Sequence, residues 1–189
     1  DLLQHDEKEI NEAELFWDKH GISESRSFVI FFAGAVSSQF DLTTPIKAVK
    51  LCNARGLDIK LAICGTGDKL DHYRRMADGE KNIIFAGWVD APRLKVLMRR
   101  SSLGLDPLPE NRNFLSNINN KAIECLGGCL PLLSCPQKGV LFQLLKDNKC
   151  GVSYISGDVD GLSSLLHDLV LDKQGMQDMS RNAKKLFDK

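Results

Sequence analysis

Short apolar segments alternate with amphipathic ones along most of the chain, and this alternation constrains the fold more than any other feature of the sequence. The apolar segments carry hydrophobic residues at successive positions, as strands do when helices cover both faces of their sheet. The amphipathic segments have the periodicity of crossover helices. The sequence therefore predicts an α/β fold with a doubly wound parallel sheet of about six strands, at residues 28–33, 59–64, 83–86, 103–105, 130–133 and 151–155.

Helical patterns fill the intervals between these strands, and a further helix precedes them. Residues 1–20 predict that first helix, which Gly21 ends. Its apolar residues Ile10, Leu15 and Phe16 are too sparse for a strong stripe facing a core. We therefore expect 1–27 to be a helical connector and 28–189 the folded domain, and the start at Asp1 without an initiator methionine suggests a piece of a longer protein. The other predicted helices are 41–54, 69–77, 91–99, 116–126, 139–146, 161–171 and 176–187.

Composition excludes several classes of function. The 25 basic and 25 acidic residues give zero net charge, which argues against a non-specific nucleic-acid binder. No apolar run reaches the length of a membrane span. The six cysteines include no C-x-x-C pair, and the four histidines have no ligand spacing beside them, so no metal site is predicted. We expect reduced cysteines packed as small hydrophobic residues, a usage typical of the cytosol.

Ligands of an open α/β sheet bind at the carboxyl ends of the strands, so the loops there are the places to inspect. Gly34 directly follows the first strand, where a glycine lets a phosphate approach the backbone. Gly65 opens a lone G-x-G, which fits both a tight strand-to-helix turn and a phosphate contact; neither a G-x-G-x-x-G nor a Walker pattern occurs. Trp88 follows Gly87 at the end of the third strand, where it could stack on a base or cover the edge of the sheet.

The segment DPLPENRNFLSNINNKAIECLGGCLPLLS, residues 106–134, carries most of the polar chemistry. Lys121 could neutralise a phosphate, and the Glu124 carboxylate could accept hydrogen bonds from a diol such as ribose. Side chains on a helix tilt toward its N-terminus, whose free N–H groups and dipole favour an anion. The alternative is a capped surface helix with a Lys121–Glu124 ion pair. The predicted core face of this helix is Ile118, Ala122, Cys125, Leu126 and Cys129, and the polar face is Asn117, Asn120, Lys121 and Glu124.

Four segments in order resemble the C-terminal, nucleotide-sugar-binding half of a GT-B glycosyltransferase, most closely the retaining family 4 enzymes of glycosyltransferase group 1. FFAGAVSSQFDLTTPIKAVKLC is similar to the first strand and helix of that half, and LAICGTGDKLDHYRRMA to its "vGxGp" segment. NIIFAGWVDAPRLKVLMRRSSLGLDPL is similar to the "v-x-f-x-G" segment and the "P" loop after it, and NNKAIECLGGCLPLLS to the "nKxxEyxxxGxPvi" segment. The resemblance implies two Rossmann-like domains across a cleft, with the N-terminal acceptor domain absent from this chain.

Matching positions imply roles for individual residues. Glu124 would hold the ribose hydroxyls, and residues 116–121 would cradle the diphosphate. The first carboxylate of the family's E-x7-E pair falls at Ser116, and the basic pair that follows the first strand falls near Ala35 and Gln39, so Lys121 would supply the missing charge. The implied catalytic residues are thus Lys121 and Ser116, and the donor-binding residues are Gly34, Gly65, Gly87, Trp88, Val89, Asn117, Asn119, Asn120 and Glu124.

The implied activity is transfer of a hexosyl group from a nucleotide diphosphate sugar to a glycan, lipid or protein acceptor, with retention of configuration. The sugar nucleotide is the donor substrate, and no separate cofactor or metal is expected. Two alternatives stay open: a non-catalytic GT-B-like subunit, and a nucleotide-sugar epimerase. We expect a cytoplasmic enzyme, with scope for peripheral contact with a membrane, and no activity from this chain alone, because the acceptor half of the cleft is missing.

Overall fold

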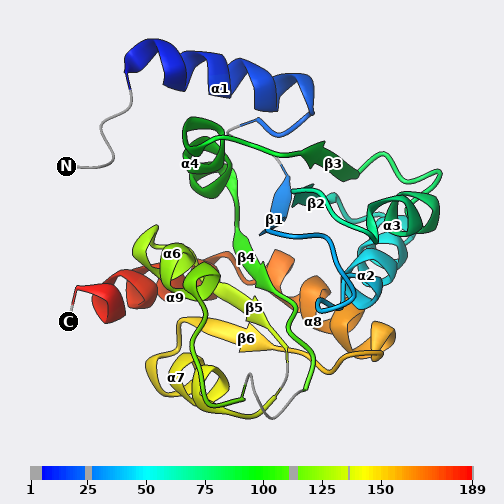
Figure 1. Cartoon of the computed structure of the whole chain (residues 1–189). Helices are drawn as coiled ribbons and strands as arrows, with labels where there is room; N and C mark the ends of the chain where they lie inside the picture. Colours follow the sequence, from blue (N-terminus) through cyan, green and yellow to red (C-terminus); the bar gives the residue numbers. More distant parts are fainter. Residues whose placement is uncertain (1–5, 24–26, 111–114, 136, 189) are drawn as a thin grey trace.

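A computed structural model describes residues 6–23, 27–110, 115–135 and 137–188, and it contains one six-stranded parallel sheet (Figure 1). The strand order is β3-β2-β1-β4-β5-β6, so the direction of winding reverses between β1 and β4. This is the strand order of a doubly wound dinucleotide-binding sheet, and the predicted fold is confirmed. The strands are β1 (Phe28–Ala33), β2 (Ile59–Cys64), β3 (Ile83–Gly87), β4 (Leu103–Asp106), β5 (Leu132–Ser134) and β6 (Gly151–Ser153).

Helices cover both faces of the sheet. Helices α2, α3 and α8 pack on one face, and α1, α4, α6 and α7 pack on the other. The C-terminal helix α9 runs past α6 (Figure 1). The helix bounds are α1 (Glu7–Lys19), α2 (Thr43–Ala54), α3 (Leu70–Met76), α4 (Ala91–Arg100), α6 (Asn120–Gly127), α7 (Val140–Asn148), α8 (Val159–Leu171) and α9 (Lys173–Phe187).

Strand β1 shows why the apolar runs carried so much information. Successive side chains of a strand point to opposite faces of the sheet. Phe31 packs in the core layer beneath α4 and α6, whereas Phe32 packs in the layer beneath α2 and α8. Both rings are buried, so a hydrophobic residue is required at each position, and the strand reads as a continuous apolar run.

Helix α1 is packed on this domain more firmly than its sequence indicated. Trp17 is fully buried, and its indole Nε1 donates to the Arg93 carbonyl of α4 at 2.7 Å. Arg100 of α4 donates to the Asp18 carboxylate at 2.8 Å and to the Ile22 carbonyl at 2.8 Å. Ile10, Leu15 and Phe16 indeed form no buried stripe, but the sequence reasoning overlooked Trp17, which buries a large surface by itself. A connecting role for 1–27 stays a prediction; residues 1–5 and 24–26 lie outside the described residues.

The helix of the polar segment begins later than predicted. The periodicity suggested a start at Ser116, but α6 begins at Asn120, with Asn119 as its N-cap. The predicted core face is correct for Ala122, Cys125 and Leu126, which are buried, whereas Ile118 and Cys129 lie outside the helix and are half-buried. All six cysteines are free thiols. Among the helices described, none is both long and apolar enough to cross a membrane.

Candidate functional site

Three glycines, Gly34, Gly65 and Gly87, lie next to one another at the carboxyl ends of β1, β2 and β3, and we call this row the glycine seam. The Gly34 N–H donates to the Cys64 carbonyl at 2.9 Å, and the Gly65 N–H donates to the Gly87 carbonyl at 2.6 Å. Gly65 has φ +130°, and a Cβ there would lie 1.9 Å from the Gly34 carbonyl oxygen. Only glycine fits such a close approach, so Gly65 is required by its packing against Gly34.

Asp106 ends β4 on the other side of the reversal in strand order. Its side chain is buried, and its Oδ2 accepts a hydrogen bond from Asn119 Nδ2 at 2.7 Å. The Asn119 Oδ1 in turn accepts from the Ala122 N–H at 3.0 Å, which caps α6. Asp106 therefore fixes the residue that starts the helix, and through it the direction in which the helix N-terminus points.

The electrostatics of Asp106 follow from its burial. Desolvation raises the pKa of its carboxyl group, while the Asn119 hydrogen bond and the Lys121 charge partly oppose that rise. Its second oxygen, Oδ1, is buried without a hydrogen-bond partner among the described residues. A carboxyl group in such surroundings is costly to ionise, so it stays protonated to a higher pH than the carboxyl group of an exposed aspartate.

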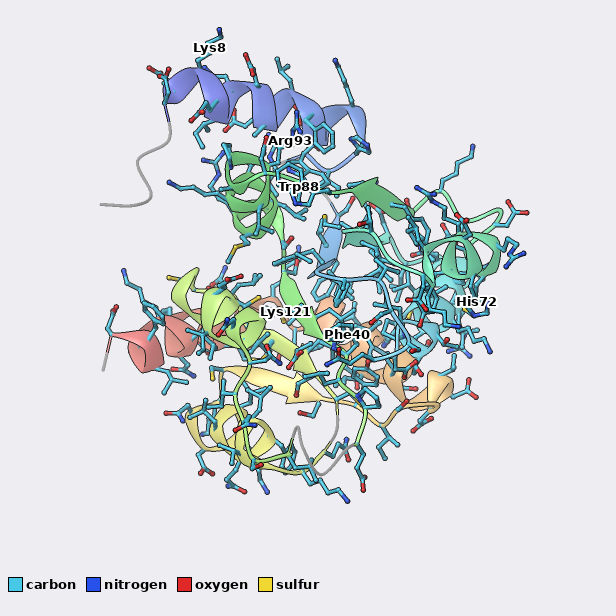
Figure 2. All side chains as sticks on the ribbon, in the orientation of Figure 1. Lys8, Phe40, His72, Trp88, Arg93 and Lys121 are labelled. Atoms are coloured by element: carbon cyan, nitrogen blue, oxygen red, sulfur yellow. The ribbon has the colours of Figure 1, made fainter. Side chains whose placement is uncertain are left out.

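Lys121 extends from the first turn of α6 across the sheet to the end of β1. A Cβ added to Gly34 would lie 2.5 Å from Lys121 Cε, so the glycine makes room for the lysine. The Lys121 Nζ lies 4.5 Å from the centre of the Phe40 ring, and Figure 2 shows the two side chains together in the middle of the molecule. Lys121 and Gly34, which the sequence placed 87 positions apart, thus meet at the switch point.

The remaining polar residues of the segment lie nearer to solvent. Asn120 and Glu124 are exposed on α6, and the part of the chain that the structure describes contains no ion pair between Lys121 and Glu124. Ser116 and Asn117 are exposed in the loop before the helix. The predicted helical stripe from Asn117 to Glu124 is therefore wrong at its first member, because the Asn119 cap starts the helix after it.

Trp88 and Val89 lie at the end of β3, at the opposite side of the glycine seam from α6. Trp88 is 72% exposed, so it does not cover the edge of the sheet, and stacking on a base stays a prediction. Val89 is half-buried against the core layer that contains α4. Among the residues described, no group of three or more His, Cys, Asp or Glu side chains is arranged to hold a metal ion.

The sequence analysis missed the roles of two residues. Asp106 was included only as the start of a loop, although a charged residue at the end of an apolar strand is an available signal. Phe40 was not singled out at all. The sequence around it does not indicate its contact with Lys121, because that contact joins two distant parts of the chain. Among the candidate residues, Gly65 contacts both Gly34 and Gly87 through the backbone, and the Lys121 side chain reaches Gly34.

A Rossmann-like domain with a cationic side chain at the switch point of its sheet is a ligand-binding domain by its class. Residues 27–172 match the family model of the glycosyl transferases group 1. The chain therefore belongs to the glycosyl transferases group 1 family. A search of curated proteins finds none that matches the sequence.

Solved structures show the same fold at low identity. The catalytic domain of cholesterol-α-glucosyltransferase from Helicobacter pylori is 17% identical with a TM-score of 0.69, over 86% of this chain and 98% of that one. The C-terminal domain of the group 1 protein LpcC from Francisella tularensis is 14% identical with a TM-score of 0.69, over 93% and 89%. HepE from Anabaena, solved with UDP and with UDP-glucose, is 16% identical with a TM-score of 0.69. The match covers 97% of this chain and only 48% of HepE, so the chain spans about half of that protein.

Proposed function

We propose that this chain is the donor-binding domain of a glycosyltransferase that moves a hexosyl group from a nucleotide diphosphate sugar to an acceptor, with retention. The observation that carries the proposal is the Lys121 ammonium at the switch point, beside the N-terminal turn of α6 and above Gly34. A diphosphate bound there would meet a positive charge and the positive end of a helix dipole. The complexes of HepE with UDP and UDP-glucose support a donor of this class.

The chemical contribution of this domain would be electrostatic. Cleavage of the bond between sugar and diphosphate leaves negative charge on the leaving phosphate, and a fixed cation stabilises that charge as it develops. Lys121 would have this role in the proposed complex. In the proposed complex, Glu124 would accept hydrogen bonds from the ribose hydroxyls, Trp88 would border the base and Ser116 would lie beside the donor sugar.

A second candidate, a non-catalytic member that binds the donor without turnover, has an observation in its favour. The loop after β1 presents exposed Ala35 and Gln39 instead of a basic pair. Position 116 holds a serine where the first carboxylate of the E-x7-E pair would lie. Lys121 is then the sole positive charge offered to the diphosphate by the positions named above. We place either protein in the cytoplasm, since six free thiols fit a reducing compartment; a lipid acceptor would bring it to a membrane surface.

Calorimetry with UDP, GDP, ADP, TDP and the parent nucleosides tests donor binding. We expect one of the diphosphates to bind weakly, and Lys121→Ala to weaken it while affinity for the nucleoside stays the same, because the lysine acts on charge. Absence of binding by every diphosphate at millimolar concentration would contradict the proposal. Sugar transfer is expected only when the acceptor domain is present, and a full-length protein that binds donor but transfers nothing would favour the non-catalytic candidate.

A further inference from the structure

The Lys121 ammonium lies at the switch point, where its charge acts on the buried Asp106 carboxyl group without a direct ion pair between the two. No ion pair or hydrogen bond to Lys121 Nζ is found within the described ranges. Its contacts are aromatic instead: Nζ lies 4.5 Å from the centre of the Phe40 ring and 5.8 Å from that of Phe32. A cation at this distance is attracted by the negative face of the ring.

Phe40 and Phe32 form a rigid surface for that cation. Their ring centres are 5.2 Å apart with the planes inclined at 62°, an edge-to-face arrangement. Phe32 is fully buried and Phe40 is 6% exposed. Phe32 is held by its strand, whereas Phe40 belongs to the loop after β1, so the position of Phe40 depends on what fixes this loop.

The loop around Phe40 is tied to four other parts of the fold. The Phe40 carbonyl accepts a hydrogen bond from the Tyr73 hydroxyl of α3 at 3.1 Å. The Asp41 N–H donates to the Pro107 carbonyl after β4 at 2.8 Å. The Asp41 Oδ2 accepts from the Thr44 and Ser156 hydroxyls, each at 2.6 Å. These bonds come from α3, the β4 loop, α2 and the segment after β6, and together they hold the Phe40 backbone in place.

We propose that Phe40 is the positioning residue for Lys121 and keeps its ammonium above Gly34. The three N–H donors of the ammonium then stay available to a phosphate. A carboxylate in the same place would neutralise the charge and occupy the donors, whereas an aromatic face attracts the cation without accepting ordinary hydrogen bonds from it. This inference rests on the proposed donor-binding function, because the value of the arrangement lies in offering a fixed, unpaired cation to a diphosphate.

Fluorination of the Phe40 ring tests the proposal with little change of shape. Fluorine withdraws electron density and weakens the negative face of the ring, so 4-fluoro- and then 3,4,5-trifluorophenylalanine at position 40 should lower UDP affinity stepwise. We expect a total loss of about two- to fivefold, the range for a cation–π contact, with uridine affinity unchanged. The same series in a Lys121→Ala background should have no effect on UDP affinity. Phe31, buried on the opposite face of the sheet, is the matched control position.

A measurement without ligand separates this inference from the proposed function. In the NMR spectrum of the free protein, the Lys121 ε-methylene protons should be shifted upfield by the Phe40 ring, and Phe40→Leu should greatly reduce that shift, leaving only the effect of the more distant Phe32 ring. If the shift is present but UDP does not bind, the positioning role stands and the proposed function fails. If UDP binds but ring fluorination leaves its affinity unchanged or raises it, or if the Lys121 signals do not depend on Phe40, the positioning role is overturned.

Discussion

The two loops that flank the switch point build the site in different ways. The loop after β1 contributes backbone: Gly34 packs against Gly65, and its exposed residues Ala35 and Gln39 carry no charge. The end of β4 and the loop after it contribute side chains, namely the buried Asp106 and the capping Asn119 that it holds. The first loop therefore determines the shape of the site, and the second determines where its charge lies.

A site whose first loop is uncharged can still present a cation that comes from the other side. Lys121 is on α6, but its ammonium lies over Gly34 and against Phe40, both of which belong to the β1 side. The two sides are thus complementary, because the glycine leaves the space that the lysine fills. Changes to the closely packed glycine backbone should therefore act mainly on folding, and changes to the exposed polar side chains of α6 mainly on ligand binding.

The largest effect is expected for Gly65→Ala, which breaks the β1 side. The added Cβ would lie 1.9 Å from the Gly34 carbonyl oxygen, at a residue with φ +130°. Backbone strain and overpacking each cost about 1–3 kcal/mol, so the free energy of unfolding should fall by about 3 kcal/mol or more in urea denaturation. Gly79→Ala is the control, since Gly79 has φ +79° and no atom near its added Cβ; it should lose only about 1–2 kcal/mol. Equal losses for the two variants would show that the close approach is unimportant.

Next in size is Glu124→Ala, which acts on the β4 side alone. If the carboxylate binds the ribose hydroxyls, its loss should lower nucleotide affinity about tenfold to a hundredfold, the worth of a charged hydrogen bond. Stability should change by less than about 0.5 kcal/mol, because Glu124 is exposed and alanine favours a helix. Glu12→Ala on the exposed face of α1 is the control for calorimetry. Unchanged nucleotide affinity in Glu124→Ala would remove this residue from the site.

A smaller, pH-dependent effect is expected for Asp106→Asn. Burial raises the pKa of Asp106 above its ordinary value of 3.8, so the folded state binds a proton more readily than the unfolded state. The contribution of this group to stability is full below pH 3.8 and is lost as the pH rises through the raised folded pKa. The asparagine variant has no such ionisation, so its stability relative to the wild type should increase across that window, by about 1.4 kcal/mol for each unit of pKa difference. Urea denaturation at several pH values measures this; a difference between the two proteins that does not vary with pH would contradict the account of Asp106.

The strands could be predicted closely from the sequence alone. Burial on both faces of a parallel sheet requires hydrophobic residues at consecutive positions, and β1 and β2 begin and end where their apolar runs do. The placement of Lys121 and Glu124 on a helix after β4 could also be anticipated from the sequence. These features are encoded in short segments, so a local pattern is enough to reveal them.

Tertiary structure decided what those patterns do. The start of α6 depends on Asn119, whose cap is fixed by Asp106 thirteen positions earlier, and the docking of α1 depends on Trp17 and the Arg93 carbonyl, 76 positions apart. The position of the Lys121 ammonium depends on the space at Gly34 and on the ring of Phe40. Sequence periodicity reports which side of a helix or strand is buried, but it carries no information on which residue lies opposite. That information arises only when the sheet brings the carboxyl ends of β1 and β4 together.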